Sequence, residues 1–310
     1  MRGRREGGDS MTSKSKKILI IVIILVCAVC VGGFLALDKA TNGILSYYSW
    51  KTTSSDSGKG TYSDINGITL YYEVHGKGEP LLLLHGGTAF IESFCRQIPA
   101  LAREFMVIAP DSRGHGRSGD TDAPLSYRTM ADDMVQLLKI LNIPRAHIVG
   151  WSDGGIIGMD IALRHPEMVN KLVLIGANFD VSGLAAEYIE STKKLTPDAP
   201  EFAEVRDFYN RIAPEPKRWP VLIDKIKTMW LSQPHYSPNE LRRIKSPALI
   251  IAGENDVIRE SHTLEMAKLI KGSRHLIVPG ASHLVPIEKY ETVNREIIGF
   301  LKDPSAPARP

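Results

Sequence analysis

One serine in the sequence stands among glycines at the end of an apolar run. Ser152 lies between Gly150 and Gly154 in the stretch HIVGWSDGGIIG, and helix-forming residues follow it. A Gly-x-Ser-x-Gly pattern between a strand and a helix is typical of a strained turn that exposes the serine hydroxyl. Glycines are favoured beside such a serine because larger side chains would collide there. We therefore predict that Ser152 is a catalytic nucleophile.

A serine hydroxyl is a weak nucleophile unless a base lies beside it. For this kind of turn the expected chain order is nucleophile, acid, histidine, so the base follows the last strand. His283 stands there, in PGASHLVP, and Asp256 leaves the preceding strand in IAGENDVI. We expect Asp256 to orient His283 and stabilise its charged form. Glu254, in the same loop, and Asp180, just past LIGANF, are the alternative acids.

Cleavage of an acyl compound also needs donors for the negative charge that develops on the carbonyl oxygen. One expected donor is the backbone N–H of Asp153, directly after the nucleophile. The other is expected in the loop after PLLLLHGG, at Gly87 or, failing that, at Thr88. The sequence thus predicts an oxyanion hole made by Gly87 and Asp153.

These residues need a framework that brings distant loops to one edge. Seven apolar or alternating runs predict strands: GITLYYEVHG, EPLLLLHGG, FMVIAPD, AHIVGWS, KLVLIGAN, PALIIAGEND and HLIVPGASH. Helical patterns fall between the later runs, at residues 91–103, 127–141, 154–164, 261–270 and 290–301. Strands that alternate with helices predict an α/β fold, with a mostly parallel sheet covered by helices on both faces. Ligands of such sheets bind at the carboxyl ends of the strands, where Ser152 is expected.

The predicted domain runs over residues 61–303, and a short tail follows at 304–310. Residues 180–245 hold helical patterns and several prolines but no strand run. A segment that long between two strands is not an ordinary loop. We expect it to form a helical cap over one end of the sheet.

The N-terminal part of the chain predicts a membrane anchor. Residues 18–37 are uncharged and almost wholly apolar, long enough as a helix to cross a bilayer. Residues 1–17 carry six Lys and Arg residues, so the positive-inside bias places them in the cytoplasm and the domain outside. A cleaved signal peptide and a buried core helix are the alternatives. Residues 38–60, polar and rich in Ser, Thr and Gly toward their end, are expected to be a linker.

Composition excludes several other classes. The formal net charge is only +3, and the basic residues are not interleaved with aromatic ones, so nucleic-acid binding is not expected. The three cysteines, two of them within the predicted span, provide no disulfide framework for the domain. No Cys/His spacing resembles a zinc site, and no metal is expected.

Five segments together resemble the alpha/beta-hydrolase superfamily in sequence, spacing and order. They are LLLLHGG, APDSRGHGRS, GWSDGG, GENDVI and GASHLVPIE. The resemblance covers residues 61 to 301 and implies an eight-stranded, mostly parallel sheet with a helical cap. It also implies hydrolysis without a cofactor, through an acyl-enzyme on Ser152.

The GWSDGG motif is similar to the corresponding motif of the valacyclovir hydrolase, or biphenyl-hydrolase-like, group. In that group the acid after the nucleophile binds the amino group of aminoacyl esters, and Asp153 holds the matching position. The resemblance therefore implies an α-amino ester substrate, whereas the alternative is an anion that merely faces a helix N-terminus. Thr88 and Trp151 are further candidate substrate contacts.

The sequence thus predicts a membrane-tethered serine hydrolase that acts on a small-molecule carboxylic ester or related acyl compound. Alternatives within the fold are a carbon–carbon bond hydrolase, a lactonase, an amidase and a cofactor-free haloperoxidase. A non-catalytic binding module on the same fold is the alternative from a different class.

Overall fold

The computed structural model describes residues 37–39 and 42–305. Its centre is an eight-stranded sheet in the order β1-β2-β4-β3-β5-β6-β7-β8. The first two strands pair antiparallel with their neighbours, and all the others are parallel. The eight-stranded, mostly parallel sheet is therefore confirmed. The strands are β1 Gly60–Ile65, β2 Ile68–His75, β3 Glu79–Leu84, β4 Phe105–Pro110, β5 Ala146–Trp151, β6 Val169–Ile175, β7 Ala248–Asn255 and β8 Arg274–Ser282.

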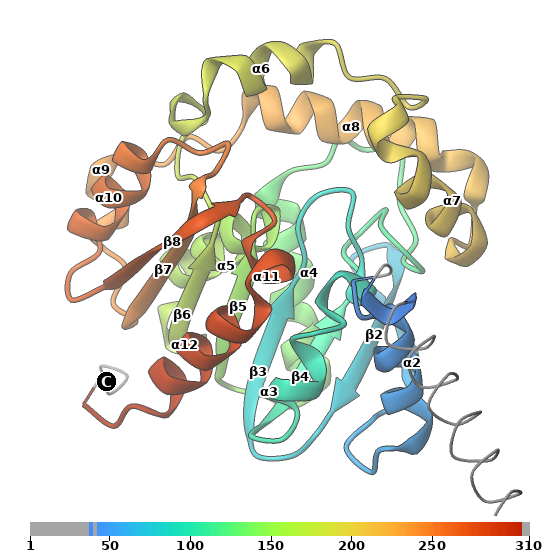
Figure 1. Cartoon of the computed structure of the whole chain (residues 1–310), viewed down its shortest axis with the longest axis horizontal. Helices are drawn as coiled ribbons and strands as arrows, with labels where there is room; N and C mark the ends of the chain where they lie inside the picture. Colours follow the sequence, from blue (N-terminus) through green and yellow to red (C-terminus); the bar gives the residue numbers. More distant parts are fainter. Residues whose placement is uncertain (1–36, 40–41, 306–310) are drawn as a thin grey trace, which may run out of the picture.

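Helices cover both faces of this sheet, as Figure 1 shows. On one face α4 (Tyr127–Ile140), α5 (Asp153–Arg164) and α10 (Glu260–Leu269) contribute to the same hydrophobic core as Leu82 and Leu84 of β3. On the other, α3 (Ile98–Leu101) and α12 (Tyr290–Lys302) contribute to the same core as Leu81 and Leu83. Successive residues of a strand point to opposite faces, so one run of leucines serves both cores.

One predicted helix, residues 91–103, is not continuous. The structure has a 3₁₀ helix, η1 (Ile91–Phe94), and then the separate short α3. Pro99 lies in the first turn of α3 and has no backbone N–H to give to a residue upstream. A long helix through this position is therefore disfavoured.

The segment between β6 and β7 carries the helices α6 (Ala186–Lys193), α7 (Ala203–Ile212), α8 (Trp219–Ser232) and α9 (Pro238–Leu241). Figure 1 shows α6, α7 and α8 arching over one end of the sheet. This end is where the loops after β3, β5, β7 and β8 carry the predicted site residues.

The stretch expected to be a linker differs in the structure. Residues Ile44–Thr53 form helix α2, which lies beside β2 in Figure 1. Tyr47 is 1% exposed, and its hydroxyl donates to Glu73 of β2 at 3.2 Å. The Lys51 ammonium lies 2.6 Å from the other oxygen of the same carboxylate. A buried carboxylate is costly without such partners, and this explains why α2 is docked on the domain.

Within the described ranges 37–39 and 42–305, every helix is too short or too polar to span a bilayer. The predicted anchor, residues 18–37, lies outside these ranges except for Leu37 and stays a prediction.

Candidate active site

The turn that carries Ser152 joins β5 directly to α5. Ser152 has φ 54° and ψ −119°, a backbone conformation that non-glycine residues rarely adopt. A Cβ added to Gly150 would lie 2.2 Å from the carbonyl oxygen of Gly154. One added to Gly154 would lie 2.1 Å from the carbonyl oxygen of Leu84. Only glycine fits at these two positions, so the strained turn explains the small residues around the serine.

The loops after β5, β7 and β8 bring three predicted residues together. The Nε2 atom of His283 lies 2.9 Å from the Oγ atom of Ser152. The Nδ1 atom of the same ring lies 2.7 Å from Oδ1 of Asp256. The Asp256 side chain is only 1% exposed, whereas that of His283 is 20% exposed. With its proton on Nδ1, donated to Asp256, the imidazole offers Nε2 as an acceptor to the serine hydroxyl.

The two alternative acids lie elsewhere. Glu254, at the exposed end of β7, accepts a hydrogen bond from the backbone N–H of Gly280 at 2.8 Å. Asp180 lies 2.8 Å from the Nδ1 atom of His235, on the cap side. The observed geometry selects Asp256 as the partner of His283.

Trp151 contacts the loop that carries His283 and does not line the cavity at Ser152. Its indole N–H donates to the backbone carbonyl of His283 at 2.9 Å, and its ring packs edge-on against Phe94. Trp151 is therefore placed to hold the His283 loop, which differs from its expected role as a substrate contact.

The loop after β3 lies against the nucleophile. A Cβ added to Gly86 would lie 3.2 Å from Cβ of Ser152, and one added to Gly87 would lie 2.4 Å from the Asp153 carboxylate. Among the described residues, no hydrogen bond to protein occupies the backbone N–H of Gly87 or of Asp153. Thr88 follows with φ 59°. The predicted donors are thus close to Ser152 and free for a ligand.

His85 fixes this loop. Its Nδ1–H donates to the carbonyl of Gly86 at 2.7 Å, and its Nε2 accepts from the backbone N–H of Ser112 at 2.9 Å. Burial, together with the nearby His115, lowers the pKa of His85 to about 3. The ring is therefore neutral at physiological pH and makes one donor and one acceptor contact.

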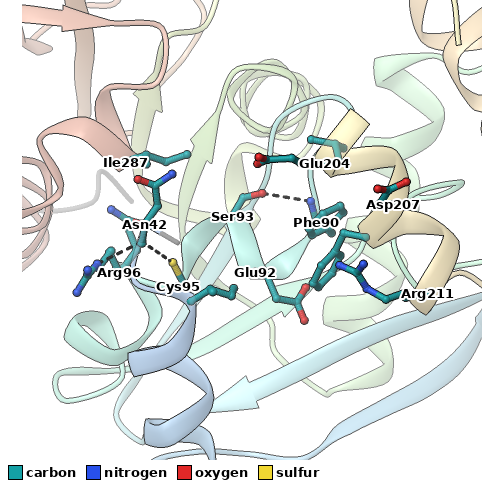
Figure 2. A pocket seen from close by; sticks show the side chains of 14 residues that line it. Asn42, Phe90, Glu92, Ser93, Cys95, Arg96, Glu204, Asp207, Arg211 and Ile287 are labelled. Atoms are coloured by element: carbon teal, nitrogen blue, oxygen red, sulfur yellow. Dashed lines mark hydrogen bonds between the residues drawn. The ribbon is translucent and has the colours of Figure 1, made fainter. Parts of the chain in front are cut away.

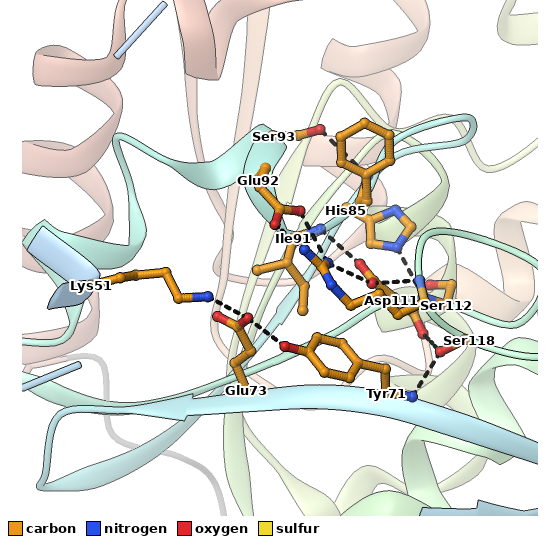
Figure 3. A network of polar contacts seen from close by, with 12 residues as sticks. Lys51, Tyr71, Glu73, His85, Ile91, Glu92, Ser93, Asp111, Ser112 and Ser118 are labelled. Carbon is orange, nitrogen blue, oxygen red and sulfur yellow. Dashed lines mark hydrogen bonds and ion pairs between the residues drawn. The ribbon is translucent and has the colours of Figure 1, made fainter. Parts of the chain in front are cut away.

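The segment DSRGHGRS forms a tight buried loop after β4, drawn in Figure 3. Asp111 accepts hydrogen bonds from the backbone N–H groups of Ile91 and Arg117, both at 2.9 Å. Arg117 also pairs with Glu92 of η1. Burial and the neighbouring Glu92 raise the pKa of Asp111 to about 7. The network joins the end of β4 to η1 and to the loop after β3, so this motif has a structural role here.

The cavity at Ser152 is small. Its free volume is about 20 Å³, close to the room that one water molecule needs. Neither Thr88 nor Trp151 lines it. Beside Ser152 and His283, the cavity is lined by residues from the core and from the cap, namely Tyr127, Asp153, Asn178, Leu184, Tyr188, Trp230, Gln233 and Ile258.

The carboxylate of Asp153 accepts hydrogen bonds from the cap and from α4. The Trp230 indole N–H, from α8, lies 3.0 Å from both of its oxygens, and the Tyr127 hydroxyl donates to Oδ1 at 2.9 Å. Burial raises the pKa of Asp153 to about 6, although both hydrogen bonds act in the opposite direction. Sequence reasoning missed Tyr127 and Trp230, because no local pattern links a helix start or a cap tryptophan to residue 153.

Comparison with known proteins agrees with this arrangement. A family model described as alpha/beta hydrolase fold matches residues 79–209, and one described as TAP-like protein matches residues 227–310. The human serine hydrolase BPHL is 31% identical over 249 residues, which cover 77% of this chain and 84% of that protein. A putative carbamate hydrolase, RutD, of Azorhizobium caulinodans is 29% identical over 260 residues, covering 74% and 94%. The crystal structure of a hydrolase from Pseudomonas aeruginosa superposes with a TM-score of 0.64 at 26% identity, covering 79% and 99%.

Proposed function

The chain belongs to the alpha/beta-hydrolase fold family and is an enzyme of the hydrolase type, and on that premise we propose that it is a serine hydrolase for carboxylic esters or related acyl compounds. The observation that carries the proposal is the contact of His283 with Ser152 on one side and with Asp256 on the other. Nucleophile, base and orienting acid in one chain of hydrogen bonds are the parts that acyl transfer needs.

In the proposed first step, the Ser152 oxygen attacks the carbonyl carbon while its proton passes to Nε2 of His283. The carbonyl π electrons move to the oxygen, which the N–H groups of Gly87 and Asp153 stabilise. Asp256 stabilises the imidazolium. Collapse of the intermediate breaks the bond to the leaving group, which takes the proton from His283 and departs as an alcohol.

In the second step, water gives a proton to Nε2 of His283 and attacks the acyl-enzyme carbonyl. The new tetrahedral intermediate expels the Ser152 oxygen, which regains its proton from the imidazolium. The products are a carboxylic acid and the free enzyme. No redox change occurs, and the residues named here supply every proton transfer.

The test is labelling by a fluorophosphonate probe, which phosphonylates an activated serine. We expect the wild-type protein and a Ser232→Ala control, altered at an exposed cap serine, to be labelled. Ser152→Ala should not be labelled. Folded wild-type protein that fails to react would contradict the proposal and favour a binding module.

The finer proposal concerns the acyl group. Asp153 lines the same cavity as Ser152, which supports an α-amino ester whose ammonium pairs with this carboxylate. Tyr127 and Trp230 already use three of its acceptor positions, and an ionised carboxylate has about four. One position therefore remains for a substrate donor.

A matched panel of α-aminoacyl, simple acyl and carbamoyl esters tests this specificity. We expect α-aminoacyl esters to have the higher kcat/KM, and Asp153→Ala to remove at least about tenfold of that advantage, since hydrogen bonds to charged groups contribute about 1.5–3 kcal/mol. The α-amino ester proposal would be contradicted if the wild type showed no higher kcat/KM for α-aminoacyl esters. It would also be contradicted if Asp153→Ala kept that preference.

We further propose that the enzyme is a single-pass membrane protein, anchored by residues 18–37 with the hydrolase domain outside the cytoplasm. The support is the uncharged run itself and the excess of basic residues before it.

A further inference from the structure

The cavity at Ser152 has no room for an ester. Its volume of about 20 Å³ suits one water molecule, whereas pockets for drug-sized ligands have roughly 300–1,000 Å³. A second cavity, of about 520 Å³, is lined by η1 and α7 and is shown in Figure 2. It does not extend the first, because the two share no lining residue within the described part of the chain. A side chain at Ser152 must therefore move before an ester fills the catalytic cavity.

The Trp230 indole occupies the space beside the predicted oxyanion donors. A Cβ added to Gly87 would lie 2.5 Å from Cζ2 of this ring. The indole N–H lies 3.0 Å from both carboxylate oxygens of Asp153. The ring therefore packs against both residues whose backbone N–H groups are expected to hold the carbonyl oxygen.

Among the residues that line the catalytic cavity, Trp230 is well placed to move. Tyr127 and Asn178 lie outside the cap helices and are buried, whereas Trp230 is half-buried and belongs to cap helix α8. Its indole N–H is bonded to Asp153 alone among the described residues. If the indole turns outward, that carboxylate keeps the Tyr127 hydroxyl as a donor, and the freed N–H meets water. The movement therefore leaves no buried polar group unpaired.

The two parts of the ester face different residues. The leaving-group oxygen must lie beside Nε2 of His283 to take its proton. The carbonyl oxygen must point to the N–H groups of Gly87 and Asp153. Within the described part of the chain, Trp230 contacts Gly87 and Asp153 and makes no hydrogen bond or ring contact with His283. The acyl chain, which points away from His283, therefore runs toward the indole.

We propose that Trp230 limits the size of the acyl group that the enzyme accepts. With the indole against Gly87, the site takes only a small acyl group, and a larger one needs the ring to turn away from Asp153. The proposal rests on the proposed function. It goes beyond the α-amino ester proposal, because it concerns the size of the acyl group instead of its charge.

The test compares two esters of p-nitrophenol that differ only in the acyl group, the acetate and the phenylacetate. The measured quantity is the ratio of their kcat/KM values, which does not depend on how much of a variant is folded. We expect Trp230→Ala to raise the phenylacetate-to-acetate ratio at least about tenfold, since one methylene in an apolar pocket already changes kcat/KM by roughly 10–200-fold. Trp230→Phe, which keeps a ring and loses the N–H, should raise this ratio less.

The matched control is Trp50→Ala. Trp50 is also a half-buried tryptophan, but it packs on Tyr47 and His75 and does not line the catalytic cavity. Its substitution should leave the ratio unchanged. A second pair of esters, methyl acetate and benzyl acetate, differs only in the alcohol, and Trp230→Ala should leave the ratio of their kcat/KM values unchanged as well.

An unchanged acyl ratio in Trp230→Ala, or an equal rise in Trp50→Ala, would overturn the inference. A larger change in the alcohol pair than in the acyl pair would overturn it too, because Trp230 would then meet the leaving group.

Calorimetry separates this inference from the proposed hydrolysis. Binding of methyl acetate and of methyl phenylacetate is measured on the full chain carrying Ser152→Ala, with and without Trp230→Ala. We expect Trp230→Ala to strengthen the binding of methyl phenylacetate alone, and unchanged binding would count against the size limit. Stronger binding, with no ester hydrolysed by the wild type or by Trp230→Ala, would support the size limit and contradict the proposed function.

Discussion

At the scale of single residues, the positions of His283 and Asp256 depend on Gly176, which makes no hydrogen bond to either of them. Gly176 follows β6 with φ 53°, and a Cβ added there would lie 3.1 Å from two ring atoms of His283 and 3.2 Å from Oδ2 of Asp256. Because both neighbours would have to shift by a few tenths of an ångström, Gly176→Ala should displace the base from Ser152. We expect kcat to fall at least about tenfold with little change in KM, since small misplacements of reacting groups are costly.

Gly272→Ala is the matched control for this substitution. Gly272 also has a positive φ, 78°, but no atom lies within 4 Å of an added Cβ. It therefore reproduces the backbone strain without the contact. Steady-state kinetics should show a large loss of kcat for Gly176→Ala and not for Gly272→Ala. An equal loss of kcat in the two variants would mean that backbone strain, and not the contact with His283, is the cause.

Asp153 makes the stability of the protein depend on pH. Its pKa is about 6 in the folded protein and near 3.8 in the unfolded chain, so the folded state holds more protons between these values. This group therefore lowers the free energy of unfolding as pH rises from about 4 to about 6, by at most about 1.4 kcal/mol for each pH step of one. Asp153→Asn cannot ionise and should lose less stability than the wild type over that interval.

Denaturant unfolding of both proteins at pH 4.5 and 7 measures the difference. The free energy of unfolding of Asp153→Asn, relative to that of the wild type, should be greater at pH 7 than at pH 4.5. A difference independent of pH would mean that the carboxyl is not perturbed by burial. Trp230→Phe, which removes one donor, should raise the pKa of Asp153 further.

Some residues of the candidate site could be predicted from local sequence patterns, and others are placed there only by tertiary packing. Ser152 was predictable because backbone contacts impose the glycines on either side of it, and Asp256 and His283 because each directly follows a strand. Trp230 and Tyr127 were not, since they reach Asp153 only through the packing of the cap on α5. The sequence could not show which way Trp151 points, because a residue beside the nucleophile can face either side of the sheet.

At the scale of elements, α2 belongs to the folded domain. Lys51 and Tyr47 both contact the buried Glu73, and a chain that starts at residue 55 would lose both contacts. We expect that chain to be less stable by up to about 3–5 kcal/mol than one that starts at residue 37, because the buried carboxylate would lose the Lys51 ammonium and keep only Tyr71 and His75 as partners. Thermal unfolding of the two shortened chains gives the measurement.

Tyr47→Phe and Lys51→Met separate the two contributions in the chain that starts at residue 37. Equal melting temperatures for the two shortened chains would show that α2 is dispensable. The sequence did not reveal this helix because its apolar residues do not gather on one face, and it is fixed by one buried carboxylate on a strand that follows it. The parallel core was predictable because its inner strands are continuous apolar runs.

At the scale of the whole molecule, the docked α2 leaves little free chain between the domain and residue 37. Asp38 is 4% exposed and pairs with Arg96. If residues 18–37 cross a bilayer, the domain would therefore lie close to the membrane surface.

The orientation of the chain can be read from its own nucleophile. The basic residues of segment 1–17 favour a cytoplasmic N-terminus, so the domain that carries Ser152 should be outside. A membrane-impermeant fluorophosphonate added to intact cells should therefore label the full chain as strongly as it does after the cells are opened. Ser152→Ala should abolish the signal in both cases. Labelling that appears only after permeabilisation would place the domain in the cytoplasm, and recovery of the labelled chain in the soluble fraction would mean that residues 18–37 do not retain it in the bilayer.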